Sequence, residues 1–144
     1  MNRSELLLAA LAAGDGRAFA PVQLQKALFL LSENISDAIT EGDGYNFEPY
    51  DFGPFDRSVY LDAEAFEREG RIDISKSSNG RWNVYRATAE GVEQGRAVLE
   101  QLSASQQDYV RKVAEWVLAQ DFAQLVKSIY KAYPHMREKS IFRG

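Results

Sequence analysis

The chain has 144 residues, of which 45% are hydrophobic and 12% aromatic, and this predicts one folded domain spanning residues 1–144. Its formal charge of −4 argues against a protein that coats nucleic acid through bulk positive charge. The chain has no cysteine and one histidine, which excludes disulfide and thiolate chemistry and a histidine-rich metal site. We therefore expect no metal and no cofactor.

The longest apolar run covers residues 6–13, whereas a membrane-spanning helix needs about 20 residues. A basic start followed by an apolar run also resembles a signal peptide. However, Glu5 interrupts that start, and Gly14-Asp15-Gly16 is typical of a helix stop. We interpret residues 4–13 as a short core helix and expect a cytoplasmic protein.

Further elements follow in chain order. A helix is predicted from Pro21 to Asn34, apolar on almost every side after Lys26. The aromatic-rich residues 45–52 indicate extended chain, and Pro54 is expected to open a helix that runs through residues 56–69. Residues 71–75 and 81–87 flank an Asn-Gly turn, which predicts a hairpin. Three more helices are expected after Thr88, Ser103 and Asp121, which are typical N-caps.

Helices, a two-stranded hairpin and more helices, in that order, are typical of a winged-helix domain with helical additions. The segment from Tyr85 to Gly91 favours this interpretation, because Thr88 can cap the next helix while Gly91 permits close packing. We therefore predict an α+β, mostly α, winged-helix-like domain with one β-hairpin and additional C-terminal helices. The alternative is an ordinary hairpin packed against helices.

Three strings in this order resemble one known family. They are Leu24 to Leu31, Tyr50 to Phe55 followed by Val59-Tyr60, and Leu125 to Pro134 with the trailing Ser140. They are similar to the Leu-Gln-Lys, Gly-Pro and Ile-Tyr-x-x-Tyr-Pro elements of the Panacea domain, also called the SocA-like antitoxin domain. The YwgA-like proteins carry similar strings, and the hairpin with its Trp82 matches that type better. The resemblance implies a non-catalytic antitoxin or proteolytic adaptor that binds a toxin-like or protease-type protein.

The segment from residue 47 to residue 62 combines aromatic and acidic side chains and is our candidate partner-binding surface. Residues 46–70 carry seven acidic and two basic side chains, a balance that suits a basic partner. The alternative interpretation is a structural plug in which the phenylalanines fill core, and we favour it for Phe52, Gly53, Pro54 and Phe55. The candidate partner-binding residues are Glu48, Tyr50, Asp51, Phe55, Arg57 and Tyr60.

The hairpin is basic, with four basic side chains and one acidic one over residues 71–87. Lys76, Arg81 and Arg86 are therefore candidate nucleic-acid contacts, and a DNA-binding regulator, acting as a dimer, is the alternative function. Against it, the helix that would enter the major groove is the acidic one over residues 56–69, which DNA would repel.

Lys26 lies in an otherwise apolar helix and permits two interpretations. It is either a functional cation facing Asp51 or another acid, or a lysine at the helix edge whose head reaches water. Carboxylate pairs such as Glu64 and Glu67 are better explained as solvated surface charges, and no nucleophile–base string is recognisable. We therefore expect no enzymatic activity. Whether the chain forms a homodimer is left open.

Overall fold

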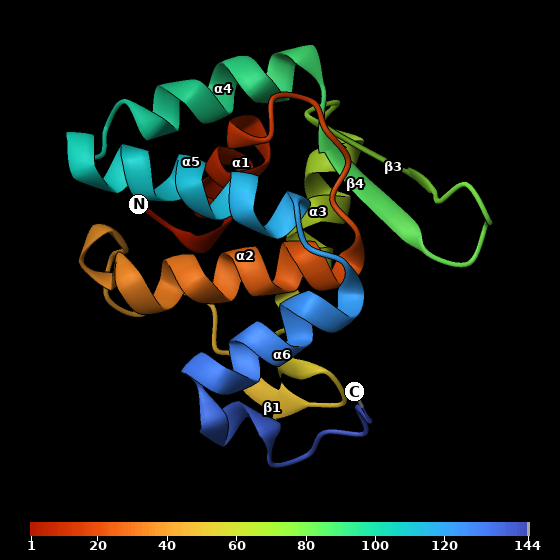
Figure 1. Cartoon of the computed structure of the whole chain (residues 1–144). Coiled ribbons are helices and arrows are strands. Elements are labelled where there is room, and N and C mark those ends of the chain that lie inside the picture. The colour runs from red at the N-terminus through yellow and green to blue at the C-terminus, as the bar shows by residue number, and fades with distance from the viewer. Residues whose placement is uncertain (144) are drawn as a thin grey trace.

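Six α-helices and two small antiparallel hairpins make up residues 1–143, the part of the chain that this computed structural model describes (Figure 1). The α+β, mostly helical class is confirmed. In chain order the elements are α1 (Arg3–Ala13), α2 (Pro21–Asn34), the 3₁₀ turn η1 (Ser36–Ala38), β1 (Glu48–Tyr50), β2 (Gly53–Phe55), α3 (Ser58–Arg68), β3 (Ile72–Lys76), β4 (Asn83–Ala87), α4 (Ala89–Leu99), α5 (Ala104–Leu118), α6 (Phe122–Ala132) and η2 (Pro134–Arg137).

Helix α1 lies at the centre of the core. Residues 6–12 are all buried, because α1 packs against α2, α3, α4 and α5. Figure 1 shows it behind α5, between α4 and α2. A helix that is apolar on every side needs such an enclosed position. The predicted N-terminal core helix is thus confirmed. Among the described residues, no helix combines the length and the apolar character needed to cross a membrane.

The junction between the β3–β4 hairpin, which we call the long hairpin, and α4 also follows the prediction. The Thr88 hydroxyl accepts a hydrogen bond from the Gly91 amide at 3.1 Å and donates one to the Gly70 carbonyl at 2.7 Å. A Cβ on Gly91 would lie 1.9 Å from the Arg71 carbonyl oxygen, so only glycine lets α4 approach this closely.

The hairpin buries one face of β4. Tyr85 and Ala87 are in the core, whereas Trp82 keeps 43% of its surface exposed. Phe19, in the segment before α2, bonds to Tyr85 through both backbone amides, at 2.7 and 2.9 Å. The hairpin is therefore attached to the helices at its base, while its turn projects from the body (Figure 1).

The prediction that Pro54 opens a helix is wrong. Residues 53–55 form β2 instead, which pairs with β1 in the register Glu48↔Phe55, and α3 begins at Ser58. The side chain of Asp56 accepts a hydrogen bond from the Ser58 amide at 2.8 Å, so the helix starts after this aspartate. Three-residue strands carry no periodic signal, so sequence analysis missed this second hairpin.

Candidate functional site

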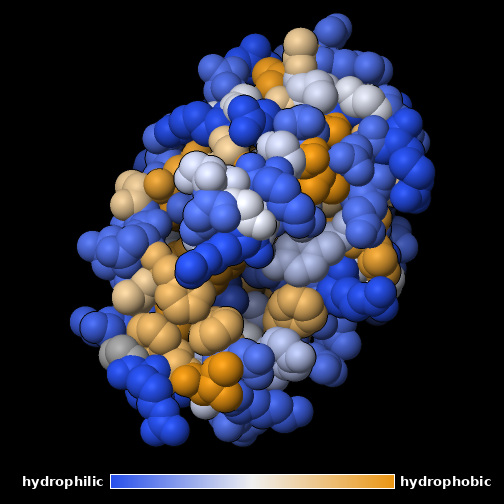
Figure 2. Space-filling model, turned by 90° about the vertical axis from the view of Figure 1, so that its right-hand side faces the viewer, coloured by the Kyte–Doolittle hydropathy of each residue, from blue (hydrophilic) through white to orange (hydrophobic). Residues whose placement is uncertain are grey.

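A groove of about 650 Å³ opens beside the β1–β2 hairpin. Its walls come from the start of α2, the β1–β2 turn, α3, the long hairpin and the start of α6. In Figure 2, hydrophobic side chains gather around a hollow on this face. The lining residues are Ala20, Pro21, Val22, Gln23, Gln25, Lys26, Tyr50, Asp51, Phe52, Gly53, Phe55, Tyr60, Trp82, Gln120, Asp121 and Phe122.

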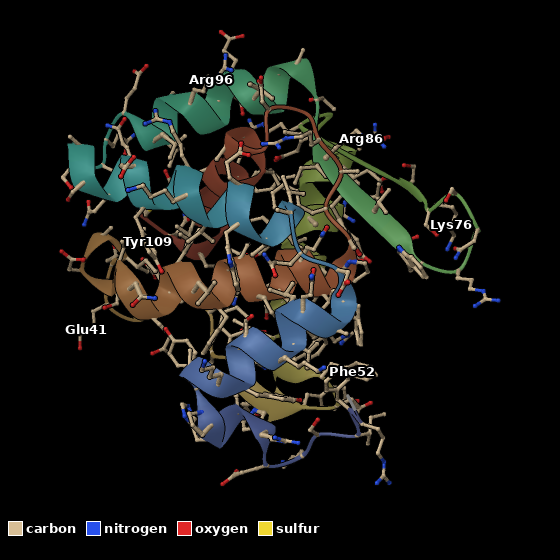
Figure 3. All side chains as sticks on the ribbon, in the orientation of Figure 1. Glu41, Phe52, Lys76, Arg86, Arg96 and Tyr109 are labelled. Atoms are coloured by element: carbon tan, nitrogen blue, oxygen red, sulfur yellow. The ribbon has the colours of Figure 1, made fainter. Side chains whose placement is uncertain are left out.

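The rim of the groove consists of exposed aromatic rings. Tyr50, Phe52, Trp82 and Phe122 expose 53%, 38%, 43% and 42% of their surfaces. Phe52, at the tip of the β1–β2 hairpin in Figure 3, contacts Phe122 edge-on, with ring centroids 5.0 Å apart. Contacts of this kind hold the rings in place in the absence of a ligand.

Aromatic contacts continue from the rim into the core. Tyr50 stacks on Phe55 at 5.1 Å, Phe55 meets Tyr60 at 5.9 Å, and Tyr60 stacks on Tyr85 at 5.6 Å. The hydroxyl of Tyr60 donates to the Pro21 carbonyl at 3.3 Å, and burial raises the pKa of Tyr60, so this ring stays uncharged. One wall of the groove is therefore rigid and neutral.

Lys26 forms the floor of the groove. Only 3% of the residue is exposed, and its ammonium donates to the Pro54 carbonyl at 3.1 Å. It makes no ion pair with any residue in 1–143. The head therefore does not reach bulk water, so the interpretation as a lysine at the helix edge is wrong, and no acid among the described residues pairs with it, so the expected partner Asp51 is wrong as well. Burial lowers the pKa of Lys26 to about 7, because an apolar environment disfavours the charged form.

The neighbouring Gln25 fixes the chain on the same side. Its amide nitrogen donates to the Asp56 carbonyl at 2.9 Å, and its amide oxygen accepts from the Asp56 amide at 3.0 Å. Gln25 and Lys26 together bind the backbone of residues 54–56 to α2. This accounts physically for a Gln-Lys pair in an otherwise apolar helix.

The C-terminal segment holds the opposite side of the β1–β2 turn. Tyr130 donates to the Ser140 hydroxyl at 2.6 Å, and the Asp51 carbonyl accepts from the Ser140 hydroxyl at 3.3 Å and the Ile141 amide at 2.9 Å. Gly53 has a φ of 102°, and a Cβ there would lie 3.3 Å from a ring carbon of Tyr130. The three strings that carry the family resemblance thus meet at this hairpin.

The structure brings four of the six candidate partner-binding residues together. Tyr50, Asp51, Phe55 and Tyr60 line the groove, whereas Glu48 and Arg57 are exposed outside it. Sequence analysis did not connect Trp82 and Phe122 with this surface. The signal that the sequence offered was an aromatic residue among polar neighbours. Trp82 stands between Arg81 and Asn83, and Phe122 directly follows the Asp121 cap.

The groove lies on an acidic part of the molecule, although three acids of residues 46–70 have internal partners, among them Glu69, which lies 3.5 Å from Arg71. Asp62 accepts hydrogen bonds from Arg3 and from Tyr45, and Asp56 accepts from the amides of Asn46 and Ser58. The other acidic side chains of residues 46–70 are exposed, except Asp51, which is half-buried on the groove wall.

The basic side chains of the long hairpin differ in their environment. Lys76 and Arg81 are exposed and form no ion pair within residues 1–143, while Arg86 lies 3.6 Å from Asp73 across the strands. Figure 3 shows Lys76 further along the projecting hairpin than Arg86. Two of the three candidate nucleic-acid contacts therefore have no charge partner in this part of the chain.

No family model matches the chain, and no curated protein shows significant similarity to it. The function is therefore argued from the site.

Proposed function

We propose that this domain is a non-catalytic protein-interaction module of the antitoxin or adaptor kind, whose partner docks in the aromatic groove. One observation carries the proposal: Tyr50, Phe52, Trp82 and Phe122, from three separate parts of the chain, surround one groove with exposed rings. Clustered apolar surface of this kind marks interaction sites, and aromatic anchors dominate binding energy at protein interfaces.

The charge around the groove defines the chemistry of the partner. Asp51 and Asp121 lie on its wall, and Glu48 is exposed on the neighbouring strand. A partner that inserts apolar side chains and surrounds them with basic ones would complement this surface and associate faster. A basic, toxin-like protein has this character.

Removal of the groove's side chains tests the proposal. The tagged protein is recovered from its own host with and without nuclease, and stoichiometric partners are quantified by mass spectrometry. We expect one protein that survives nuclease and is lost from the double variant Tyr50→Ala with Asp51→Ala. Trp116→Ala is the matched control, because Trp116 exposes 37% of its surface but does not line the groove. A groove variant that folds like the wild type and still keeps every partner would contradict the proposal.

A DNA-binding regulator is the second candidate, favoured by Lys76 and Arg81, which lie exposed on a projecting hairpin and form no ion pair with the described residues. Two phosphate contacts contribute a slope of about −2 to the logarithmic salt dependence of duplex binding. If the hairpin contacts DNA, the variant Lys76→Ala with Arg81→Ala should make the slope of the salt dependence less negative by about 2. Recovery of DNA alone, lost on nuclease treatment, would favour this candidate over a protein partner.

A further inference from the structure

The ammonium of Lys26 has unused hydrogen-bonding capacity at the floor of the groove. A lysine has three N–H donors, and the Pro54 carbonyl is the one acceptor that the described residues supply. With 3% of the residue exposed, the remaining donors are not surrounded by bulk water. A buried cation without a counter-charge is destabilising, so a group that completes its coordination would be bound favourably.

No neighbouring side chain supplies that counter-charge. Asp51 and Asp121 line the groove, but neither lies within 4 Å of the lysine nitrogen, and Asp121 caps α6 through the Gln124 amide. The hydroxyl of Tyr60 is bonded to the Pro21 carbonyl and that of Tyr130 to Ser140. The anion must therefore come from the occupant of the groove.

A carboxylate suits this position, because it has the opposite charge and two oxygens for the free donors. The apolar walls restrict where the carboxylate sits on the occupant. An internal aspartate or glutamate would bring peptide groups on both sides into the groove, and these would lose water without gaining partners. A chain end brings fewer such groups and carries its carboxylate next to its last side chain.

We propose that Lys26 binds the free C-terminal carboxylate of the partner protein, with the partner's last apolar side chains seated among Phe52, Phe55 and Trp82. This inference rests on the proposed function, which it deepens by naming the segment of the partner that enters. Lys26 would act here as a binding residue for the chain end and Pro54 as the acceptor that orients it.

Binding of this kind depends on pH in a defined direction. Only the ammonium form attracts a carboxylate, and the pKa of Lys26 in the empty groove is about 7. Affinity should therefore be constant at low pH and weaken about tenfold for each pH unit above 7. The other titratable groups that line the groove are Tyr50, Asp51 and Asp121 on its wall and Tyr60, whose pKa burial raises.

The test uses a rhodamine-labelled peptide in which two lysines precede Ala-Leu-Phe, made once with a free C-terminus and once as the C-terminal amide. Fluorescence anisotropy gives both dissociation constants with the full-length protein. We expect the acid to bind at least tenfold more tightly than the amide, and its affinity to fall about 100-fold between pH 6 and pH 9. In Lys26→Met the two peptides should bind equally.

Three outcomes would overturn the inference. The first is equal affinity of wild-type protein for acid and amide, or no saturable binding of the acid. The second is equally tight binding of an amidated peptide with an internal glutamate, which would reject the chain end. The third is an equal loss of acid and amide binding in Lys26→Met, which is what a purely structural lysine would cause.

The proposed function is tested separately by Trp82→Ala. If this variant weakens both peptides while the acid has no advantage, the groove is a docking site and only the role of Lys26 is rejected. If neither peptide responds to Trp82→Ala and the host partner is also retained, the groove itself is rejected as the docking surface.

Discussion

Replacement of Lys26 by methionine should stabilise the protein at neutral pH. Methionine has a similar length and fills the same apolar space, so packing is largely retained. The lysine has a pKa of about 7 in the folded protein against an ordinary value of 10.5. At pH 7 the depressed pKa corresponds to about 4 kcal/mol of destabilisation, since one pKa unit equals about 1.4 kcal/mol.

Part of that gain is offset by a lost hydrogen bond. The Pro54 carbonyl loses its bond to a charged donor, which is worth about 2 kcal/mol. The free energy of unfolding of Lys26→Met should therefore exceed that of the wild type by about 2 kcal/mol at pH 7.

The pH dependence of this difference is the sharper measurement. Between pH 7 and 10.5 the unfolded wild type binds more protons at this site than the folded protein. The wild type therefore gains stability as the pH rises, by about 1.4 kcal/mol per unit, so the advantage of the variant disappears by about pH 9, above which the wild type is the more stable protein. Below pH 7 both states are protonated, and the difference is constant.

Urea unfolding of both proteins at pH 6, 7, 8, 9 and 10, followed by circular dichroism, measures this difference. A second variant, Lys127→Met, is the control, because Lys127 is exposed on α6 and should show no such trend. A difference between wild type and Lys26→Met that is flat from pH 7 to 10 would refute the reasoning, since it would mean that the ammonium is as well solvated as in the unfolded chain.

Three further substitutions test contacts that hold the fold and the groove. Gly91→Ala should destabilise the protein by more than about 2 kcal/mol in urea unfolding, because the new methyl group would overlap the Arg71 carbonyl. Gln25→Leu should cost about 1–3 kcal/mol, because two partly buried backbone groups of Asp56 lose their partners; a loss below about 0.5 kcal/mol would contradict this. Tyr130→Phe should cost about 1 kcal/mol and increase proteolysis of the C-terminal tail, which its hydroxyl holds.

Most helix starts were predictable because the signals that specify them are local. Ser103 accepts from the Gln106 amide at 3.2 Å and Asp121 from the Gln124 amide at 2.8 Å, in the patterns that the sequence indicated. These bonds span three residues, so the same short segment carries the signal and the structure. The Asn-Gly turn of the long hairpin is local in the same sense.

The candidate site was only half predictable. The aromatic and acidic character of residues 47–62 drew attention to Tyr50, Asp51, Phe55 and Tyr60, which do line the groove. The other wall, however, comes from a hairpin and a helix that are distant in sequence. No composition or periodicity relates these segments to one another, so this half of the groove could not be inferred.

The sequence by itself determined the helices, the long hairpin and the mostly helical class, because capping, turn chemistry and apolar periodicity act over a few residues. Only the tertiary structure decided the β1–β2 hairpin, the groove and the state of Lys26. The deciding contacts join residues 28 apart, from Lys26 to Pro54, and 89 apart, from Asp51 to Ser140. The sequence shows that an apolar helix contains one lysine, but the solvation of that lysine depends on which distant segments of the chain cover it.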